Sequence, residues 1–228
     1  MYKHFFKRLF DIVSSGMALV VLSPILLYVA YLVKTRLGSP VLFTQVRPGK
    51  DGRLFRMYKF RSMTDERDAD GKLLPDDVRL TDFGKKLRAT SLDELPELIN
   101  IFKGDMSVVG PRPQLVRDMV FFTEEEMQRQ SVYPGLTGLA QICGRNNITW
   151  KEKFAFDLQY IKNITFLEDM RIIYRTVFKV SAQEDIATDG METAEDYGDW
   201  LLRTGQISKD EYDRKQAEAK RMLEEYEG

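Results

Sequence analysis

Two adjacent carboxylates, Asp93 and Glu94, are the first candidates for a catalytic or metal-binding site. A helix that began at Leu92 would place Pro96 inside it, where proline removes a backbone hydrogen bond, so we expect the helix to begin at Pro96. The two carboxylates then lie just before a helix N-terminus, which favours their ionised forms. In that state they could hold a divalent cation or attack a phosphorus atom. The structural alternative is a capping box between Ser91 and Glu94, which would only begin a helix.

Candidate phosphate-binding cations accompany this pair of carboxylates. Pro111 and Pro113 restrict the backbone on both sides of Arg112, and Pro113 suits the first position of a following helix. A guanidinium held in this way beside free backbone N–H groups is suited to a phosphate, although the same residues could simply form a rigid helix entry. Further cations lie at the end of a predicted strand and in a Gly/Asn-rich loop: Lys59, Arg61 and Arg145.

Composition excludes several classes of site and of protein. The single cysteine, Cys143, excludes an intramolecular disulfide, and with only one histidine, His4, a conventional structural zinc site is excluded as well. Any metal must therefore be held by oxygen ligands. The 228 residues include 34 basic and 35 acidic side chains, and 43% of them are hydrophobic. This balance indicates a globular chain and excludes a polycation that coats nucleic acid.

Charge is distributed unevenly along the chain. Residues 1–40 contain five basic residues and one acidic residue, whereas residues 181–228 contain 14 acidic and six basic residues. Within the first segment, Ile12–Val33 carries no formal charge over 22 residues. As a helix this segment would be about 33 Å long, which is close to the thickness of the hydrocarbon core of a bilayer.

Two features of this apolar segment argue against one straight membrane span. Pro24 lies at its middle and removes the hydrogen bond to the carbonyl of Val20, to which the hydroxyl of Ser23 could donate instead. Basic residues flank both ends, and the positive-inside rule places such residues in the cytoplasm. A re-entrant hairpin broken at Ser23-Pro24 satisfies both features, and a kinked transmembrane helix is the alternative that the residues leave open.

The remaining sequence predicts an α+β fold that is mainly helical with a small β-hairpin. Runs rich in β-forming residues at 41–46 and 54–60 flank a Pro/Gly turn and predict the hairpin. Predicted helices cover about 96–103, 113–130, 151–163, 169–183 and 207–226. The helix at 169–183 is amphipathic with basic residues four apart, so it could lie on an anionic membrane surface or cover the core. The helix at 207–226 is highly charged, and we expect it to be peripheral.

Taken in order, five motifs resemble those of the bacterial sugar transferase family, the monotopic phosphoglycosyl transferases that begin glycan assembly on polyprenyl phosphate. The motifs are Gln45-x-Arg47-x-Gly49, Lys59-Phe60-Arg61-Ser62-Met63, Asp93-Glu94-Leu95-Pro96, the string from Gly104 to Pro113, and Pro134-Gly135-Leu136-Thr137-Gly138. The resemblance covers residues 2–185. Because the multi-span N-terminal half of the larger members is not found here, the chain is similar to the small PglC-like type.

The resemblance implies three segments: a re-entrant membrane anchor at 1–38, a catalytic domain at 39–186, and an acidic helical C-terminal extension at 187–228 that lies outside the common pattern. It implies a location on the cytoplasmic face of the bacterial inner membrane. There a sugar 1-phosphate would pass from a UDP-sugar to undecaprenyl phosphate with release of UMP, as the first membrane step of glycan assembly such as N-linked glycosylation. UDP-diNAc-bacillosamine is one candidate donor beside glucose, galactose and N-acetylglucosamine donors, and downstream glycosyltransferases are candidate partners.

Residue roles follow from the same resemblance. Asp93 would be the covalent nucleophile, and Mg²⁺ would be held by Asp93 and Glu94. The substrate-binding residues that the resemblance implies are Lys59, Arg61, Pro111, Arg112, Pro113, Arg145 and Asp157. Two other interpretations stay open: a membrane-tethered phosphohydrolase with water as the acceptor, and a non-enzymatic scaffold that recruits glycosyltransferases through the acidic extension.

Overall fold

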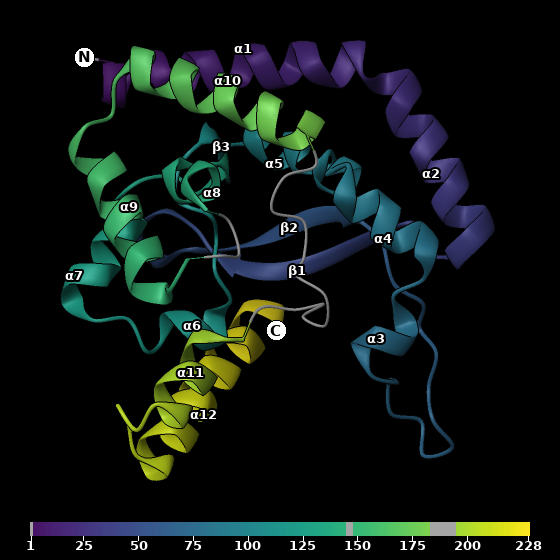
Figure 1. The fold of residues 1–228 in the computed structure, drawn as a ribbon, viewed down its shortest axis with the longest axis vertical. Helices are drawn as coiled ribbons and strands as arrows, with labels where there is room; N and C mark the ends of the chain where they lie inside the picture. The colour runs from purple at the N-terminus through teal and green to yellow at the C-terminus, as the bar shows by residue number, and fades with distance from the viewer. Residues whose placement is uncertain (1, 145–147, 183–194) are drawn as a thin grey trace.

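The computed structural model of the protein describes residues 2–144, 148–182 and 195–228. In chain order its helices and strands are α1 (Phe6–Val21), α2 (Ser23–Leu37), β1 (Leu42–Pro48), β2 (Leu54–Phe60), α3 (Asp76–Arg79), α4 (Asp82–Ala89), α5 (Glu97–Lys103), β3 (Ser107–Val109), α6 (Val116–Met119), α7 (Glu124–Met127), β4 (Gly135–Thr137), α8 (Leu139–Cys143), α9 (Trp150–Lys162), α10 (Phe166–Ala182), α11 (Tyr197–Arg203) and α12 (Lys209–Glu227). Figure 1 shows α1 and α10 along one side, the β1–β2 hairpin through the middle, and α11 and α12 on the opposite side.

The apolar N-terminal segment is a bent pair of helices, as the sequence predicted. α1 and α2 meet at Leu22 with a bend of 64°, and Pro24 is the second residue of α2. The hydroxyl of Ser23 donates to the carbonyl of Val20 at 2.7 Å, so the backbone group that Pro24 leaves without a donor has a partner. Within the described residues no single helix has the length and apolar composition for a membrane span, whereas this bent pair has both together.

Two polar side chains of α1 attach it to α5 and to the strand β3. The guanidinium of Arg8 donates to the carbonyl oxygens of Ile101 at 2.7 Å and of Phe102 at 3.1 Å, in the last turn of α5. Asp11, which is 1% exposed, accepts hydrogen bonds from the backbone N–H of Val108 and the hydroxyl of Ser107. A cation at the C-terminus of α5 satisfies carbonyl groups that have no partner inside the helix.

The predicted hairpin is confirmed, and a second, parallel strand pair was not foreseen. β1 pairs with β2 in antiparallel register, with Thr44 opposite Tyr58. β3 pairs with β4 in parallel, with Ser107 opposite Gly135. A Cβ atom at Gly135 would lie 2.1 Å from the backbone nitrogen of Gly110, so the two segments touch backbone to backbone and only glycine fits there.

The predicted single helix at 113–130 is wrong. Leu115 is extended, and the chain forms only the short helices α6 and α7 before a 3-10 turn. Thr123 begins α7 with a capping box to Glu126, which starts a new helix instead of continuing α6. Pro113 therefore begins no helix. The predicted helices at 96–103, 151–163, 169–183 and 207–226 correspond to α5, α9, α10 and α12.

α10 buries only part of its apolar surface. Ile172 is fully buried, but Tyr174, Val177 and Phe178 are each more than half exposed. α1 carries a second set of exposed apolar side chains: Phe6, Leu9, Val13, Met17, Val20 and Val21. α1 and α10 are joined at one end, where the ammonium of Lys7 contacts a carboxylate oxygen of Asp169 at 2.6 Å.

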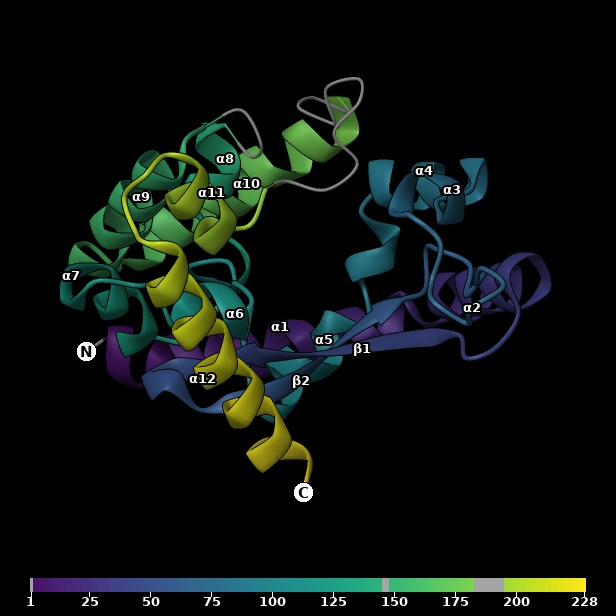
Figure 2. The ribbon, with the colours of Figure 1, turned by 90° about the horizontal axis from the view of Figure 1, so that it is seen from below.

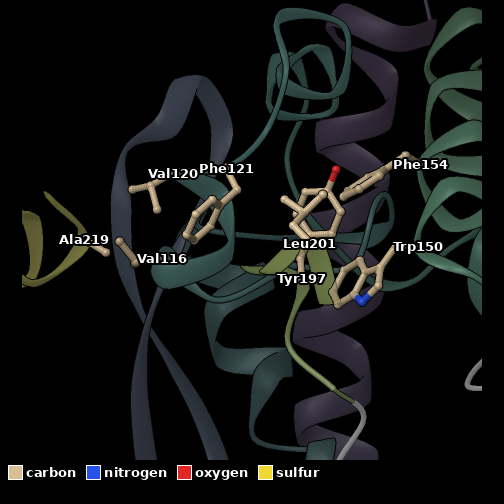
Figure 3. Close-up of a cluster of buried hydrophobic side chains, with 8 residues drawn as sticks. All are labelled: Val116, Val120, Phe121, Trp150, Phe154, Tyr197, Leu201 and Ala219. Atoms are coloured by element: carbon tan, nitrogen blue, oxygen red, sulfur yellow. The ribbon is translucent and has the colours of Figure 1, made fainter. Parts of the chain in front are cut away.

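The C-terminal extension packs into the body of the protein, although its charge led us to expect a peripheral helix. Tyr197 and Leu201 of α11 and Ala219 of α12 belong to one buried apolar cluster with side chains from α6 and α9 (Figure 3). The carboxylate of Asp118 accepts the backbone N–H of Tyr197 at 2.8 Å, which fixes the start of α11 on α6. The charged residues of α12 form its solvated face, while its few apolar residues close the cluster.

Leu201→Ala is expected to lower the free energy of unfolding by about 2–4 kcal/mol, because it removes a buried side chain from this cluster and leaves a cavity. Denaturant unfolding of the detergent-solubilised protein measures the change. Leu73→Ala, at a leucine that is 40% exposed, is the matched control and should change stability far less. Equal losses for the two variants would contradict the packing role of the extension.

Candidate active site

The carboxylate pair lies in a tight turn between two helices. Leu92–Glu94 form a 3-10 turn, Pro96 is the N-cap of α5, and α5 begins at Glu97, so the predicted position of the pair before a helix start is confirmed. Ser91 has φ of 54°, a left-handed conformation that is costly for a residue with a side chain. Its side chain makes no capping hydrogen bond, which excludes the capping-box alternative.

Glu94 joins two cations that come from different parts of the fold. The ammonium of Lys59, on β2, lies 2.8 Å from Oε1 of Glu94, and a terminal nitrogen of Arg112, in the loop after β3, lies 2.5 Å from the same atom. Burial alone would raise the pKa of Glu94, but the charges and hydrogen bonds of these two cations hold it well below its usual range. Glu94 in turn raises the pKa of Arg112.

A third carboxylate, Glu97, completes the cluster and was not singled out from the sequence. Its side chain is 2% exposed, and its Oε1 lies 3.2 Å from the ammonium of Lys59. Burial raises the pKa of Glu97 to about 7 against the opposing attraction of Lys59. Its spacing could have identified it, because Glu97 follows Glu94 by three residues, and residues three apart lie on the same face of a helix.

Both glutamates form ion pairs, whereas the carboxylate of Asp93 forms no ion pair and accepts no hydrogen bond from any described residue. The side chain is buried, and burial together with the negative charge of Glu94 raises its pKa to about 6. We expected the helix N-terminus to favour ionisation of both members of the pair, whereas burial opposes it at Asp93. In its ionised form the carboxylate has lone pairs available to a ligand or an electrophile.

The loop that carries Arg112 is held through its backbone by two other arginines. Arg129 donates to the carbonyl oxygen of Arg112 at 2.6 Å and forms two hydrogen bonds to one carboxylate oxygen of Asp157. Arg47 donates to the carbonyl oxygen of Pro113 at 3.4 Å. Asp157 and Arg129 are both buried, so the structure places Asp157 behind Arg112 and not beside the carboxylate pair. The sequence offered no local signal for Arg129.

The remaining predicted residues are distributed as follows. Lys59 and Arg112 are brought to the carboxylate pair, and Pro111 and Pro113 flank Arg112. Arg61 is not in this cluster, because its guanidinium donates to the carbonyl oxygens of Leu37 and Ser39, at the end of α2, and pairs with Asp65. Arg145 lies outside the described residues. Ser23 and Pro24 form the bend between α1 and α2.

No group of three or more His, Cys, Asp or Glu side chains in the described residues is arranged to hold a metal ion alone. One oxygen of Glu94 is already shared by two cations, while Asp93 is open. A cation that takes only one or two carboxylates and completes its shell with water and phosphate, as Mg²⁺ does, fits these two residues. A cation that requires a full protein cage does not fit them.

Comparison with known proteins supports the family resemblance that the sequence motifs indicated. The family model for bacterial sugar transferases matches residues 2–183. An uncharacterised sugar transferase of Bacillus subtilis, EpsL, is 49% identical over 189 residues, which are 83% of this chain and 94% of that protein. A UDP-glucose:undecaprenyl-phosphate glucose-1-phosphate transferase of Klebsiella pneumoniae is 45% identical over 76% of this chain, and an undecaprenyl-phosphate galactose phosphotransferase of Salmonella typhimurium is 40% identical over 79%. The matches cover only 40% and 41% of those two proteins.

Asp157→Asn is expected to destabilise the fold by about 3–5 kcal/mol, because it leaves the buried guanidinium of Arg129 without a compensating charge. Denaturant unfolding measures the loss. Glu195→Gln is the matched control, since it removes a carboxylate that also forms two hydrogen bonds to one arginine, Arg203, but in an exposed position. The control should unfold like the wild type. Wild-type stability of Asp157→Asn would contradict a structural role for this pair.

Proposed function

The chain belongs to the bacterial sugar transferase family, and from that premise we propose that it transfers a sugar 1-phosphate from a UDP-sugar to undecaprenyl phosphate. The observation that carries this proposal is a buried aspartate that accepts no hydrogen bond from the described residues, next to a glutamate that binds two cations. The names of the Klebsiella and Salmonella relatives, which describe sugar phosphate transfer to undecaprenyl phosphate, support the same reaction.

The first step that we propose is a displacement at phosphorus. A carboxylate oxygen of Asp93 attacks the β-phosphorus of the UDP-sugar and forms an Asp93–phosphorus bond. The bond from that phosphorus to the bridging oxygen breaks, and UMP leaves with the electron pair. Lys59 and Arg112, both paired with the neighbouring Glu94, would contact the diphosphate oxygens, and their positive charges would stabilise the charge that develops on them. Glu94 holds both cations in position before the substrate binds.

The second step returns the enzyme to its starting state. A phosphate oxygen of undecaprenyl phosphate attacks the phosphorus of the aspartyl phosphosugar, and the bond to Asp93 breaks. The products are a polyprenyl diphosphate sugar and a free Asp93 carboxylate, so the enzyme gains and loses no atoms over the cycle. Covalent catalysis of this kind divides one transfer between two large substrates into two displacements at one residue.

The second substrate requires a site at the membrane surface, and we propose that the bent helix pair supplies it as a re-entrant anchor. Basic residues lie at both ends of the pair, which favours the cytoplasmic side for both. The exposed apolar side chains of α1 and α10 would then face lipid. This arrangement places the enzyme on the cytoplasmic face of the inner membrane, where the phosphate of the lipid is found at the headgroup level.

The identity of the transferred sugar would determine the pathway in which the enzyme acts. The donors considered are UDP-glucose, UDP-galactose, UDP-N-acetylglucosamine and UDP-diNAc-bacillosamine, and a bacillosamine donor would imply N-linked glycan assembly. Release of UMP from each donor, with and without undecaprenyl phosphate, selects among them. Sugar phosphate that accumulates without lipid would support a phosphohydrolase instead.

If Asp93 is the covalent nucleophile, enzyme given only the UDP-sugar should release about one UMP per active site and then stop. Addition of undecaprenyl phosphate should restart release, and kinetics with both substrates should be ping-pong. Rapid-quench measurement of UMP tests this directly. Asp93→Asn should abolish the burst, because the amide keeps the shape of the side chain but is a poor nucleophile.

Glu94→Gln is the comparison variant for this experiment, because it removes a neighbouring charge and keeps Asp93. It should weaken turnover while leaving a measurable burst. UMP release that requires both substrates together would contradict a covalent intermediate on Asp93. A burst of UMP from Asp93→Asn would show that another group is the nucleophile, whereas glycan assembly that persists in cells carrying Asp93→Asn without UMP release would favour the scaffold interpretation.

We further propose that Asp93 and Glu94 bind Mg²⁺ together with the substrate phosphates. When bound, the ion supplies positive charge that neutralises the diphosphate. Treatment with EDTA should abolish UMP release, and added Mg²⁺ or Mn²⁺ should restore it, whereas Zn²⁺ should not. Full activity after chelation would remove the metal from the proposal.

A further inference from the structure

One side chain of the C-terminal extension is buried among residues that the family model matches. That model ends at residue 183, whereas Tyr197 is the first residue of α11 and is only 5% exposed. Figure 2 shows α11 at the same end of the molecule as α6, α7 and α9, with α2 and α4 at the other end. The extension therefore adds a core residue of its own next to the elements that follow the Arg112 loop.

The ring of Tyr197 packs on two phenylalanines from different elements. Its centroid lies 5.9 Å from that of Phe122, in the segment between α6 and α7, and 5.0 Å from that of Phe154, on α9 (Figure 3). Its backbone N–H donates to the carboxylate of Asp118, and its hydroxyl donates to Glu126 at 3.0 Å. Contacts at the ring, the hydroxyl and the backbone thus hold this side chain in one position.

Both phenylalanine rings also contact the guanidinium of Arg129. Its central carbon lies 5.4 Å from the centroid of Phe122 and 5.8 Å from that of Phe154, which are cation–π distances. Arg129 in turn donates to the carbonyl oxygen of Arg112 at 2.6 Å. A continuous series of contacts therefore leads from Tyr197, through the two rings and Arg129, to the backbone of Arg112.

The rings supply a restraint on Arg129 that its ion pair does not supply. Nε and one terminal nitrogen of Arg129 both donate to the same carboxylate oxygen of Asp157. Two bonds to one oxygen leave the guanidinium able to rotate about that point. Packing of Phe122 and Phe154 on the guanidinium limits this rotation, which would otherwise move the donor away from the carbonyl oxygen of Arg112.

α11 is seated too closely on the protein body to shift without moving these rings. A Cβ atom at Gly198 would lie 2.5 Å from the ring of Phe121, so the helix backbone is in direct contact with that ring. Phe121 directly precedes Phe122 in the chain. The position of α11 and the position of Phe122 are therefore coupled.

We propose that Tyr197 is a positioning residue for Arg112. Through the two phenylalanines and Arg129 it fixes the backbone of the loop that carries Arg112, and with it the guanidinium that would contact the diphosphate of the UDP-sugar. This inference rests on the proposed function. Tyr197 touches no reacting atom, and the C-terminal extension becomes a supporting part of the donor site.

The test compares the amplitude and the rate of the UMP burst in Tyr197→Leu, which keeps an apolar side chain but removes the ring. The amplitude counts folded active sites, whereas the rate depends on the placement of Arg112. We expect an amplitude close to that of the wild type and a rate about 5- to 30-fold slower, because small displacements of a substrate-binding group are costly. The KM for the UDP-sugar should rise, and that for undecaprenyl phosphate should stay within about twofold.

Two matched variants separate positioning from stability. Tyr212→Leu makes the same change in α12, where the ring stacks on Phe121 and not on the rings that contact Arg129, so its burst rate should stay near the wild-type value. Tyr197→Phe keeps the ring and loses only the hydroxyl bond to Glu126, so it should keep most of the rate.

A double-mutant cycle tests the route of the effect. Phe122→Leu should also slow the burst, because it removes one of the two rings between Tyr197 and Arg129. If both residues act through Arg129, the two changes together should slow the burst less than the product of their separate effects. Effects that simply multiply would show that Tyr197 acts independently of Phe122 and would contradict this route.

The remaining outcomes are decisive as well. A smaller amplitude with an unchanged rate would assign Tyr197 to stability alone and overturn the proposal, as would an equal loss of rate in Tyr212→Leu. If Tyr197→Leu does not fold, the same readings on Tyr197→Met decide, and failure of both to fold would also assign Tyr197 to stability. If release needs both substrates together, the KM for the UDP-sugar replaces the burst rate. A wild-type enzyme that releases no UMP from any UDP-sugar would instead contradict the proposed function itself.

Discussion

One oxygen of Glu94 holds Lys59 and Arg112 together, and the rest of the site depends on this shared contact. The two cations come from a strand and from a loop about fifty residues later, so neither segment can move without breaking an ion pair to Glu94, whose side chain is only 15% exposed. Both cations contact Glu94, and Asp93 beside it accepts no hydrogen bond from the part of the chain that the structure describes. The two carboxylates therefore have different roles: Glu94 positions the two cations, and Asp93 is available to react.

The helix that follows this pair also connects the site to the proposed membrane anchor. α5 has Asp93 and Glu94 just before its first residue and the guanidinium of Arg8 on the carbonyls of its last turn. Arg8 belongs to α1, and Asp11 of α1 accepts a hydrogen bond from Val108 of β3, the strand that precedes Arg112. The depth of α1 in a membrane would therefore set the height of the nucleophile above it.

The sequence predicted helix bends and helix starts correctly where they depend only on neighbouring residues. Proline logic placed both the bend at Ser23-Pro24 and the start of α5, because a missing N–H acts on its own helix wherever that helix packs. The same logic failed at Pro113, because the loop after β3 is held by contacts to Arg47, Arg129 and a glycine far along the chain. Arg61 was predicted from the same motif as Lys59 to bind substrate, but its guanidinium donates to backbone carbonyls at the end of α2. Such long-range partners leave no periodic signal in the sequence.

The central claim is that Asp93 becomes covalently bonded to a phosphosugar. Enzyme incubated with a UDP-sugar in the absence of lipid, quenched and digested with trypsin, tests it by peptide mass. The account predicts that the peptide of residues 89–103 gains the mass of one sugar phosphate, that the modified residue is Asp93, and that undecaprenyl phosphate added before the quench removes the adduct. An unmodified peptide under conditions in which UMP has been released would contradict the account.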